Sequence, residues 1–220
     1  NEWLMQNGYL KLKSKPDGVA PISQCDIDWS ATTAWSEGGY YARVFMNVKG
    51  REPQGVIDPE DYEAVRSELA ARLAAIPDEN GRPIATRCYR PEELYRTVNG
   101  IAPDLIVYFG DLDWRSVGSV GTGKIHTFEN DTGADDANHA QMGVFVMYDP
   151  RNPGKGQHLH GLKITDVAPT LLNLYGLPIP SGMVGSPIVI PEGSRKDDSP
   201  VYSTAEEAIV RQRLEDLGYL

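Results

Sequence analysis

The chain has 220 residues, of which 40% are hydrophobic and 24% charged, a composition typical of an ordinary globular domain. Its formal net charge is −10, from 31 acidic and 21 basic residues. A negative field repels phosphate backbones, and no Lys/Arg stripe reverses it locally, which argues against nucleic acid as a surface partner. No run approaches the roughly 18 consecutive apolar residues of a membrane-spanning helix, so we expect no membrane partner.

The two cysteines bear on the cellular compartment. Cys25 and Cys88 are far apart and in no metal-ligand spacing. They could form a disulfide, but two buried, reduced thiols are the favoured interpretation. The sequence shows no basic-then-apolar leader. Because it opens at Asn1 rather than Met, the absence of a leader says little about the compartment. The thiols favour the cytoplasm.

The first half of the chain predicts short helices and strands in alternation. Residues 1–12 indicate a short helix or turn, and residues 40–48 alternate with aromatic and β-branched side chains, the pattern of a strand. Asp58 is the natural N-cap of a helix that opens with a proline. That helix carries one apolar stripe, made of Val65, Leu69, Leu73 and Ile76. Residues 84–89 predict a short strand, and Pro91 begins a brief helix.

The second half contains two continuous apolar runs, residues 104–109 and 143–148, which predict strands buried on both faces. The roughly 30 residues between them are rich in Gly, Asp, Asn and Thr, and a loop of that length is usually functional. Residues 166–176 predict a helix closed by Gly176, and Thr204 caps a final amphipathic helix. Strands that alternate with helices indicate an α/β layered fold.

The loop ENDTGADDANHAQ at residues 129–141 is the most unusual part of the sequence, and it carries a single imidazole, His139. Ligands collect at loops beside strand ends in α/β proteins, and a neutral His is the commonest metal ligand. The alternative is a His that caps the strand through hydrogen bonds within the loop. One His without a visible partner favours that second interpretation.

Other candidate features are weaker. His158 and His160 would point to one side of a strand, but the glycines around them indicate a loop. His126 lies on an alternating stretch and is interpreted as a strand residue. The run GSVGTG at residues 118–123 suggests a phosphate cradle, yet it lacks the Gly-Lys-Ser/Thr ending and the following helix, so a hairpin is favoured.

Arg51 lies where the strand at residues 40–48 ends in a glycine turn. An Arg side chain can hold phosphate in a bidentate fork, which makes Arg51 a candidate substrate contact. A surface ion pair with Glu52 or Asp58 is the favoured alternative. The residues alone assign no Ser/His/Asp or Cys/His catalytic set.

Three stretches, residues 39–53, 100–150 and 161–188, include the motifs GYYARVFMNVKGREP and DVAPTLL followed by GLPIP. They resemble the C-terminal half of predicted phosphohydrolases or phosphomutases of the alkaline phosphatase superfamily, related to type I phosphodiesterase/nucleotide pyrophosphatases. The resemblance implies an alkaline phosphatase-like α/β fold, with a mostly parallel sheet flanked by helices and incomplete in this chain. We expect a single domain over residues 1–220, with residues 193–220 as a tail that carries the terminal helix.

In that superfamily a Thr or Ser nucleophile bridges two divalent metal ions, here expected to be Zn²⁺ or Mn²⁺, and forms a covalent intermediate with phosphorus. The late metal-ligating His of the family lies in a small-residue loop before a core strand. His139 matches it, so the resemblance implies that His139 is a metal ligand. Arg51 and Asn138 are added as candidate substrate contacts, and the expected substrate is a small phosphate ester, either a monoester or a diester.

The family's Asp-His-Gly step and its nucleophile segment do not occur in this sequence. We therefore expect that the chain begins just after that step, holds at most one metal ligand and is inactive by itself. The alternative is a non-catalytic binding or regulatory module with the same fold. Removal of the first half of a sheet would expose a strand edge, so we also expect self-association through that edge.

Overall fold

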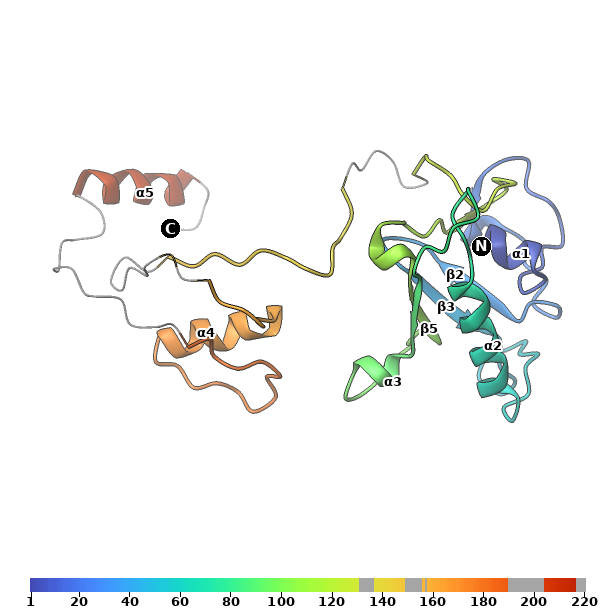
Figure 1. Ribbon diagram of the computed structural model, residues 1–220, viewed down its shortest axis with the longest axis horizontal. Coiled ribbons are helices and arrows are strands. Elements are labelled where there is room, and N and C mark those ends of the chain that lie inside the picture. Colours follow the sequence, from blue (N-terminus) through green and yellow to red (C-terminus); the bar gives the residue numbers. More distant parts are fainter. Residues whose placement is uncertain (131–136, 149–155, 157, 190–203, 217–220) are drawn as a thin grey trace. The chain divides into compact units, whose positions relative to one another are not determined.

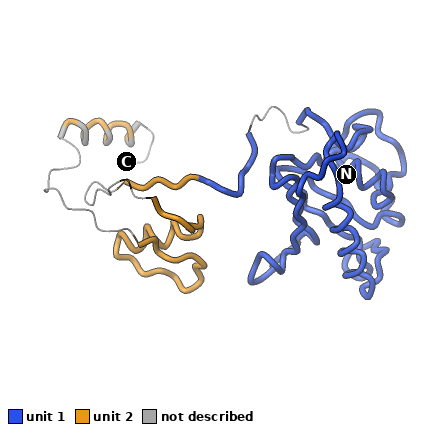
Figure 2. Tube along the Cα trace, in the orientation of Figure 1, with its two compact units in different colours: residues 1–143 blue, residues 144–220 orange. Residues whose placement is uncertain are grey.

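The computed structural model describes residues 1–130, 137–148, 156, 158–189 and 204–216. It divides into two compact units, residues 1–143 and residues 144–220 (Figure 2), and each is described by itself. The single domain expected over residues 1–220 stays a prediction. Among the described residues, none of the helices combines the length and the hydrophobicity needed to span a bilayer.

The first unit is built on a four-stranded sheet with the order β2-β3-β5-β4. Strands β2, β3 and β5 of this sheet are labelled in Figure 1. The strands are β2 at Ala34–Glu37, β3 at Ala42–Met46, β4 at Arg87–Tyr89 and β5 at Leu105–Tyr108. The sequence analysis predicts β3, β4 and β5, and it misses β2. A second, two-stranded sheet pairs β1 (Ala20–Pro21) with β6 (Ser119–Val120).

Every strand pair of the four-stranded sheet is antiparallel. The resemblance implies a mostly parallel sheet, and the described strands do not pair in that way. Antiparallel neighbours need only a short connection, such as the one between β2 and β3, whereas parallel neighbours need a crossover of about a dozen residues. The alkaline phosphatase-like fold stays a prediction, as does self-association through the sheet edges that β2 and β4 form.

The core lies on one face of this sheet. Alternate residues of β3, namely Ala42, Val44 and Met46, are buried, whereas Arg43 between them is exposed. Helix α2 (Tyr62–Ala74) contacts β4 and β5 and buries Leu69 and Leu73. Full burial of a leucine side chain stabilises the fold by roughly 1.5–3 kcal/mol, so the apolar stripe read from the sequence holds this helix in place.

The predicted N-cap of α2, Asp58, is wrong, because Asp61 occupies that position. Helix α2 begins at Tyr62 rather than beside Asp58, because a turn in which the Asp61 N–H donates to the Asp58 carbonyl (3.0 Å) precedes it. Helix α1 spans Glu2–Gln6. Helix α3 (Pro91–Leu94) begins at the predicted proline. Short 3-10 turns occur at Ile22–Gln24 (η1) and Phe109–Leu112 (η2).

The two thiols lie apart in the first unit and are free. The Cys88 Sγ donates to the Ala70 carbonyl of α2 at 3.4 Å, and the Cys25 Sγ donates to the Pro21 carbonyl at 3.5 Å. Burial raises the pKa of the Cys88 thiol to about 12. A thiol with such a pKa is a poor nucleophile at neutral pH.

The second unit contains helices α4 (Val167–Leu174) and α5 (Thr204–Asp216), both predicted. A 3-10 turn, η3 (Ile164–Asp166), leads into α4. The chain leaves that helix through Gly176, whose φ of +66° suits glycine. Of the tail predicted at residues 193–220, residues 193–203 and 217–220 lie outside the described residues.

The buried strand predicted at residues 143–148 is wrong in the structure. The segment forms no strand among the described residues, and Val144, Val146 and Tyr148 are 94%, 85% and 77% exposed. A strand obtains its hydrogen bonds from a neighbour, not from itself. An apolar run therefore predicts burial without supplying the partner strand that burial requires.

Candidate functional site

The chain makes a strained turn directly after β5, the central core strand that precedes the candidate loop. Gly110, Asp111 and Leu112 have φ values of +59°, +57° and +78° in succession. Left-handed backbone costs a non-glycine residue on the order of 1–3 kcal/mol and is concentrated at functional sites. A side chain at Gly110 would lie 2.8 Å from Trp114. The Leu112 carbonyl at the end of this turn accepts a hydrogen bond from the candidate loop.

Asn138 links the candidate loop to this turn. Its Nδ2 donates to the Leu112 carbonyl, and its Oδ1 accepts the backbone N–H of His139 at 2.9 Å. Residues 131–136 of the same loop lie outside the described residues. The amide of Asn138 therefore holds the backbone that carries His139.

The His139 ring packs against Tyr40, with 3.8 Å between ring centroids and an angle of 54° between ring planes. The guanidinium carbon of Arg115 lies 4.6 Å from the centroid of the same Tyr40 ring, a cation–π distance. Gly39 and Ser116 exchange backbone hydrogen bonds of 2.8 and 2.9 Å, which fixes Tyr40 beside Arg115. Three distant segments of the sequence thus meet around one tyrosine.

The residues present fit a metal ion only in part. His139 is exposed, so its ring can reach a ligand. Among the described residues, however, no three His, Cys, Asp or Glu side chains gather closely enough to hold a metal. A site that includes His139 needs further ligands from outside those residues, and the described groups support no catalytic step through a metal.

The structure places Arg51 in an ion-pair network. The carboxylate of Asp104, whose side chain is 2% exposed, accepts from Arg51 Nη1 at 2.7 Å and from Nη2 at 2.8 Å. Arg51 Nε donates to Glu52 at 2.7 Å, one of the two predicted partners. The other predicted partner, Asp58, instead accepts from Lys49 at 2.8 Å.

Two more donors complete the network around Asp104. The Met46 N–H donates to Oδ2 at 2.6 Å, and the Tyr62 hydroxyl donates to Oδ1 at 2.5 Å. Hydrogen bonding to Asp104 raises the pKa of Arg51 above its usual value. Burial, and then the hydrogen bond to Asp104, raises the pKa of Tyr62 to about 12. Each guanidinium nitrogen of Arg51 has a partner within the fold, and its role as a substrate contact stays a prediction.

The glycine run at residues 118–123 contains β6, and one of its N–H groups bonds to a carboxylate side chain of the same protein. The Gly121 N–H donates to the Glu2 carboxylate at 2.9 Å. The run is paired with β1 rather than folded as a two-strand hairpin of its own. The Gly121 N–H therefore links this run to helix α1 through Glu2.

The remaining histidines lie elsewhere. The interpretation of His126 as a strand residue is wrong, because it lies in coil, where its Nε2 is 2.8 Å from the Pro77 carbonyl. His158 and His160 are exposed in coil, as the surrounding glycines indicate. Sequence reasoning missed Tyr40 and Arg115, since no motif marks them. Only the strand prediction at residues 40–48 gave a signal, by placing Tyr40 at a strand end.

Comparison with known proteins finds a partial similarity. Over 62 residues, 28% of this chain, the sequence is 39% identical to a 2,3-bisphosphoglycerate-independent phosphoglycerate mutase of Aeromonas salmonicida. The matched part covers 12% of the mutase. No family model and no solved structure matches the chain.

Proposed function

We propose that this chain is part of a metal-dependent phosphoryl-transfer enzyme of the alkaline phosphatase superfamily, and that His139 is one of its metal ligands. The observation that carries the proposal is the setting of His139. Its backbone is fixed by Asn138 at the left-handed turn after β5, and its ring is exposed beside Tyr40. Metal-binding histidines need such orientation by neighbouring groups.

The similarity to a mutase supports the proposal at this coarse level, because cofactor-independent phosphoglycerate mutases belong to the same superfamily. Two divalent ions, zinc or manganese, would polarise the phosphoryl oxygens of a small phosphate ester. Hydrolysis passes the phosphoryl group to water, whereas a mutase returns it to the substrate. We place hydrolysis of a monoester or diester first and mutase chemistry second, with Arg51 and Asn138 as candidate substrate contacts.

The metal-ligand proposal is tested with Mn²⁺, which broadens nearby NMR signals. The chain has four histidines, so the imidazole spectrum of ¹⁵N-labelled protein is simple. His139 is expected to broaden at the lowest Mn²⁺ concentration, and His126, held by the Pro77 carbonyl, to broaden last. The matched variants are His139→Ala and His158→Ala. Broadening that starts at His158 or His160, or that survives His139→Ala unchanged, would show that the assigned ligand is wrong.

The activity is tested on the full-length gene product that contains this sequence. With Mn²⁺ or Zn²⁺ it should cleave a p-nitrophenyl phosphate monoester or diester, or transfer phosphoryl groups in a ³¹P NMR assay. The 220-residue chain alone should do neither. His139→Ala in the full-length protein should lower the rate by at least about 100-fold, because loss of an outer contact of a metal ligand alone costs about 10-fold to 100-fold. A full-length protein that acts on no ester with either metal contradicts the proposal.

A second candidate is a non-catalytic binding or regulatory module. The observation in its favour is that the described residues bring no three metal-binding side chains together. The same two experiments separate the candidates. A module would show neither selective broadening at His139 nor ester cleavage by the full-length protein.

A further inference from the structure

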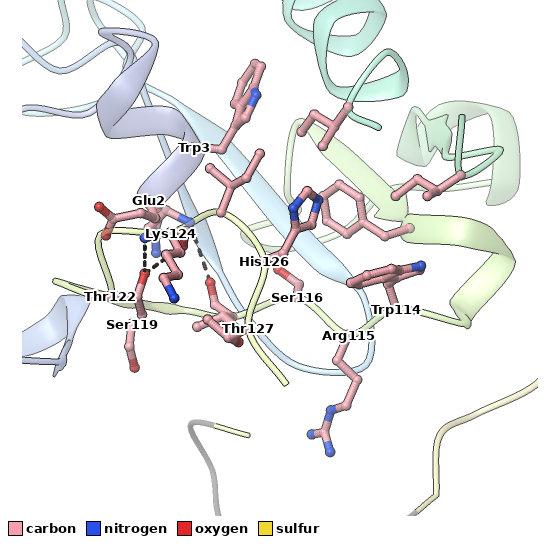
Figure 3. Close-up of a pocket in the computed structure, with 16 residues that line it drawn as sticks. Glu2, Trp3, Trp114, Arg115, Ser116, Ser119, Thr122, Lys124, His126 and Thr127 are labelled. Carbon is pink, nitrogen blue, oxygen red and sulfur yellow. Dashed lines mark hydrogen bonds between the residues drawn. The ribbon is translucent and has the colours of Figure 1, made fainter. Parts of the chain in front are cut away.

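A cavity of about 110 Å³ lies in the first unit (Figure 3) and takes no part in the function proposed above. One wall is aromatic and aliphatic, and the rim is polar. The aromatic side chains that line it are Trp3, Phe109, Trp114 and His126. Three isoleucines, Ile76, Ile84 and Ile125, complete the apolar part. Such a wall with a few polar groups is typical of small-molecule sites.

Two of the lining rings, those of Trp3 and His126, are held by residues that do not line the cavity. His126 packs against Trp114 with 5.4 Å between centroids, and its Nε2 donates to the Pro77 carbonyl at 2.8 Å. Trp3 stacks on Tyr9 at 5.9 Å. In Figure 3, His126 is drawn between the two indoles. Rings that are fixed before binding lose little conformational entropy when a ligand arrives, so this wall is prepared for a flat partner.

The rim carries a positive charge. In the described part of the chain, no carboxylate forms an ion pair with Lys124, which lines the cavity and is exposed. The acid at the rim, Glu2, already accepts the Gly121 N–H at 2.9 Å. The other lining cation, Arg115, stacks on Tyr40. The charge of Lys124 therefore selects for a negative group on the ligand.

The volume limits the size of the ligand. A closed apolar cavity of about 150 Å³ holds benzene, so a cavity of about 110 Å³ sets one aromatic ring as the upper limit for a ligand. We propose that this cavity binds a small ligand with one aromatic ring and one negatively charged group. The ring packs against Trp114 and His126, and the negative group lies beside Lys124.

The test uses benzoate, with benzamide as the uncharged probe and inorganic phosphate as the probe without a ring. The four indole N–H signals report the site, because Trp3 and Trp114 line the cavity whereas Trp29 and Trp35 pack on each other elsewhere, 4.9 Å apart. Benzoate should shift Trp3 and Trp114 and leave Trp29 and Trp35 unchanged. Shifts with phosphate alone, shifts spread over all four indoles, or none at millimolar benzoate would overturn the proposal.

A pair of lysine variants tests the charge. Lys124→Met should weaken benzoate binding by about threefold to fivefold, the effect of one exposed charge, and leave benzamide binding unchanged. Lys11→Met, at an exposed lysine outside the cavity, should change neither. If benzamide binds as tightly as benzoate to the unmodified chain, or if both variants behave alike, Lys124 does not recognise the negative group and the proposal fails.

Discussion

The guanidinium of Arg51 and the carboxylate of Asp104 form a two-pronged ion pair, with Nη1–Oδ1 and Nη2–Oδ2 distances of 2.7 and 2.8 Å. The pair joins the turn after β3 to the start of β5. The Asp104 side chain is 2% exposed and that of Arg51 is 45% exposed. Changes at the buried Asp104 carboxylate should therefore cost more stability than changes at exposed ion pairs, because water cannot replace a lost partner there.

Asp104→Asn should lower the free energy of unfolding by about 3 kcal/mol, because it removes the charge that accepts four hydrogen bonds from Arg51, Met46 and Tyr62. Asp58→Asn is the matched control. Its partner Lys49 is 51% exposed, and loss of an exposed pair costs about 0.5 kcal/mol. Urea unfolding followed by tryptophan fluorescence measures the first unit alone, since all four tryptophans lie within residues 1–143. Equal urea midpoints for the two variants would contradict the larger contribution to stability that is assigned to Asp104.

Tyr62 should make stability depend on pH in the alkaline range. Its folded-state pKa is about 12, above the ordinary value of 10.0. The stabilisation is fully present below pH 10.0, and it is lost as pH rises towards 12, because the unfolded state releases its proton first. Between these values the unmodified chain should lose stability more steeply than Tyr62→Phe. Parallel urea midpoints for the two proteins across that range would refute the assignment.

Gly38 should tolerate no side chain, although its φ is not left-handed. A Cβ there would lie 2.2 Å from the backbone nitrogen of Gly118. The backbone segments that contain Gly38 and Gly118 therefore approach too closely for any residue other than glycine at position 38. Gly38→Ala should cost about 3 kcal/mol of unfolding free energy through overpacking. Gly18→Ala, where a Cβ would meet nothing within 4 Å, should be neutral or stabilise by up to about 1 kcal/mol. If Gly38→Ala leaves the free energy of unfolding unchanged, the backbones at Gly38 and Gly118 must lie farther apart than the structure shows.

The sequence was most informative where one local pattern decides the structure. The apolar stripe of α2 and the proline that opens α3 required only their own neighbours, and both helices occur. The alternation at residues 40–48 likewise predicted β3, because buried and more exposed side chains alternate along the strand. Local periodicity and capping carry such information.

The sequence was least informative where the partner is distant. Nothing local distinguishes Asp104 from Asp58 as the partner of Arg51, because the choice is made by the antiparallel pairing of β3 with β5. The run at residues 143–148 has the composition of a core strand and yet is exposed. His139 was found only as a lone imidazole, since its contact with Tyr40 depends on the fold.

Asn138 should be a positioning residue for His139. Replacement by alanine removes the links to Leu112 and to the His139 N–H, so the His139 ring should leave Tyr40. In the metal-free chain, its ring protons should lose the ring-current shift that a centroid distance of 3.8 Å produces. Mn²⁺ affinity at His139 should fall by about tenfold, as for other outer contacts of a metal ligand. Asn80→Ala, at an exposed asparagine in another turn, is the control and should change neither measurement.

The two readouts separate positioning from direct binding. If Asn138 touched the ligand without positioning His139, Mn²⁺ affinity would fall while the ring-current shift stayed. If Asn138 had no role, both would stay at their values in the unmodified chain. The contacts of Asn138 with Leu112 and His139 predict that both readouts are lost together. The tryptophan-detected urea midpoint should stay close to that of the Asn80→Ala chain. This result is expected because the amide of Asn138 connects the backbone of His139 to the strained turn after β5.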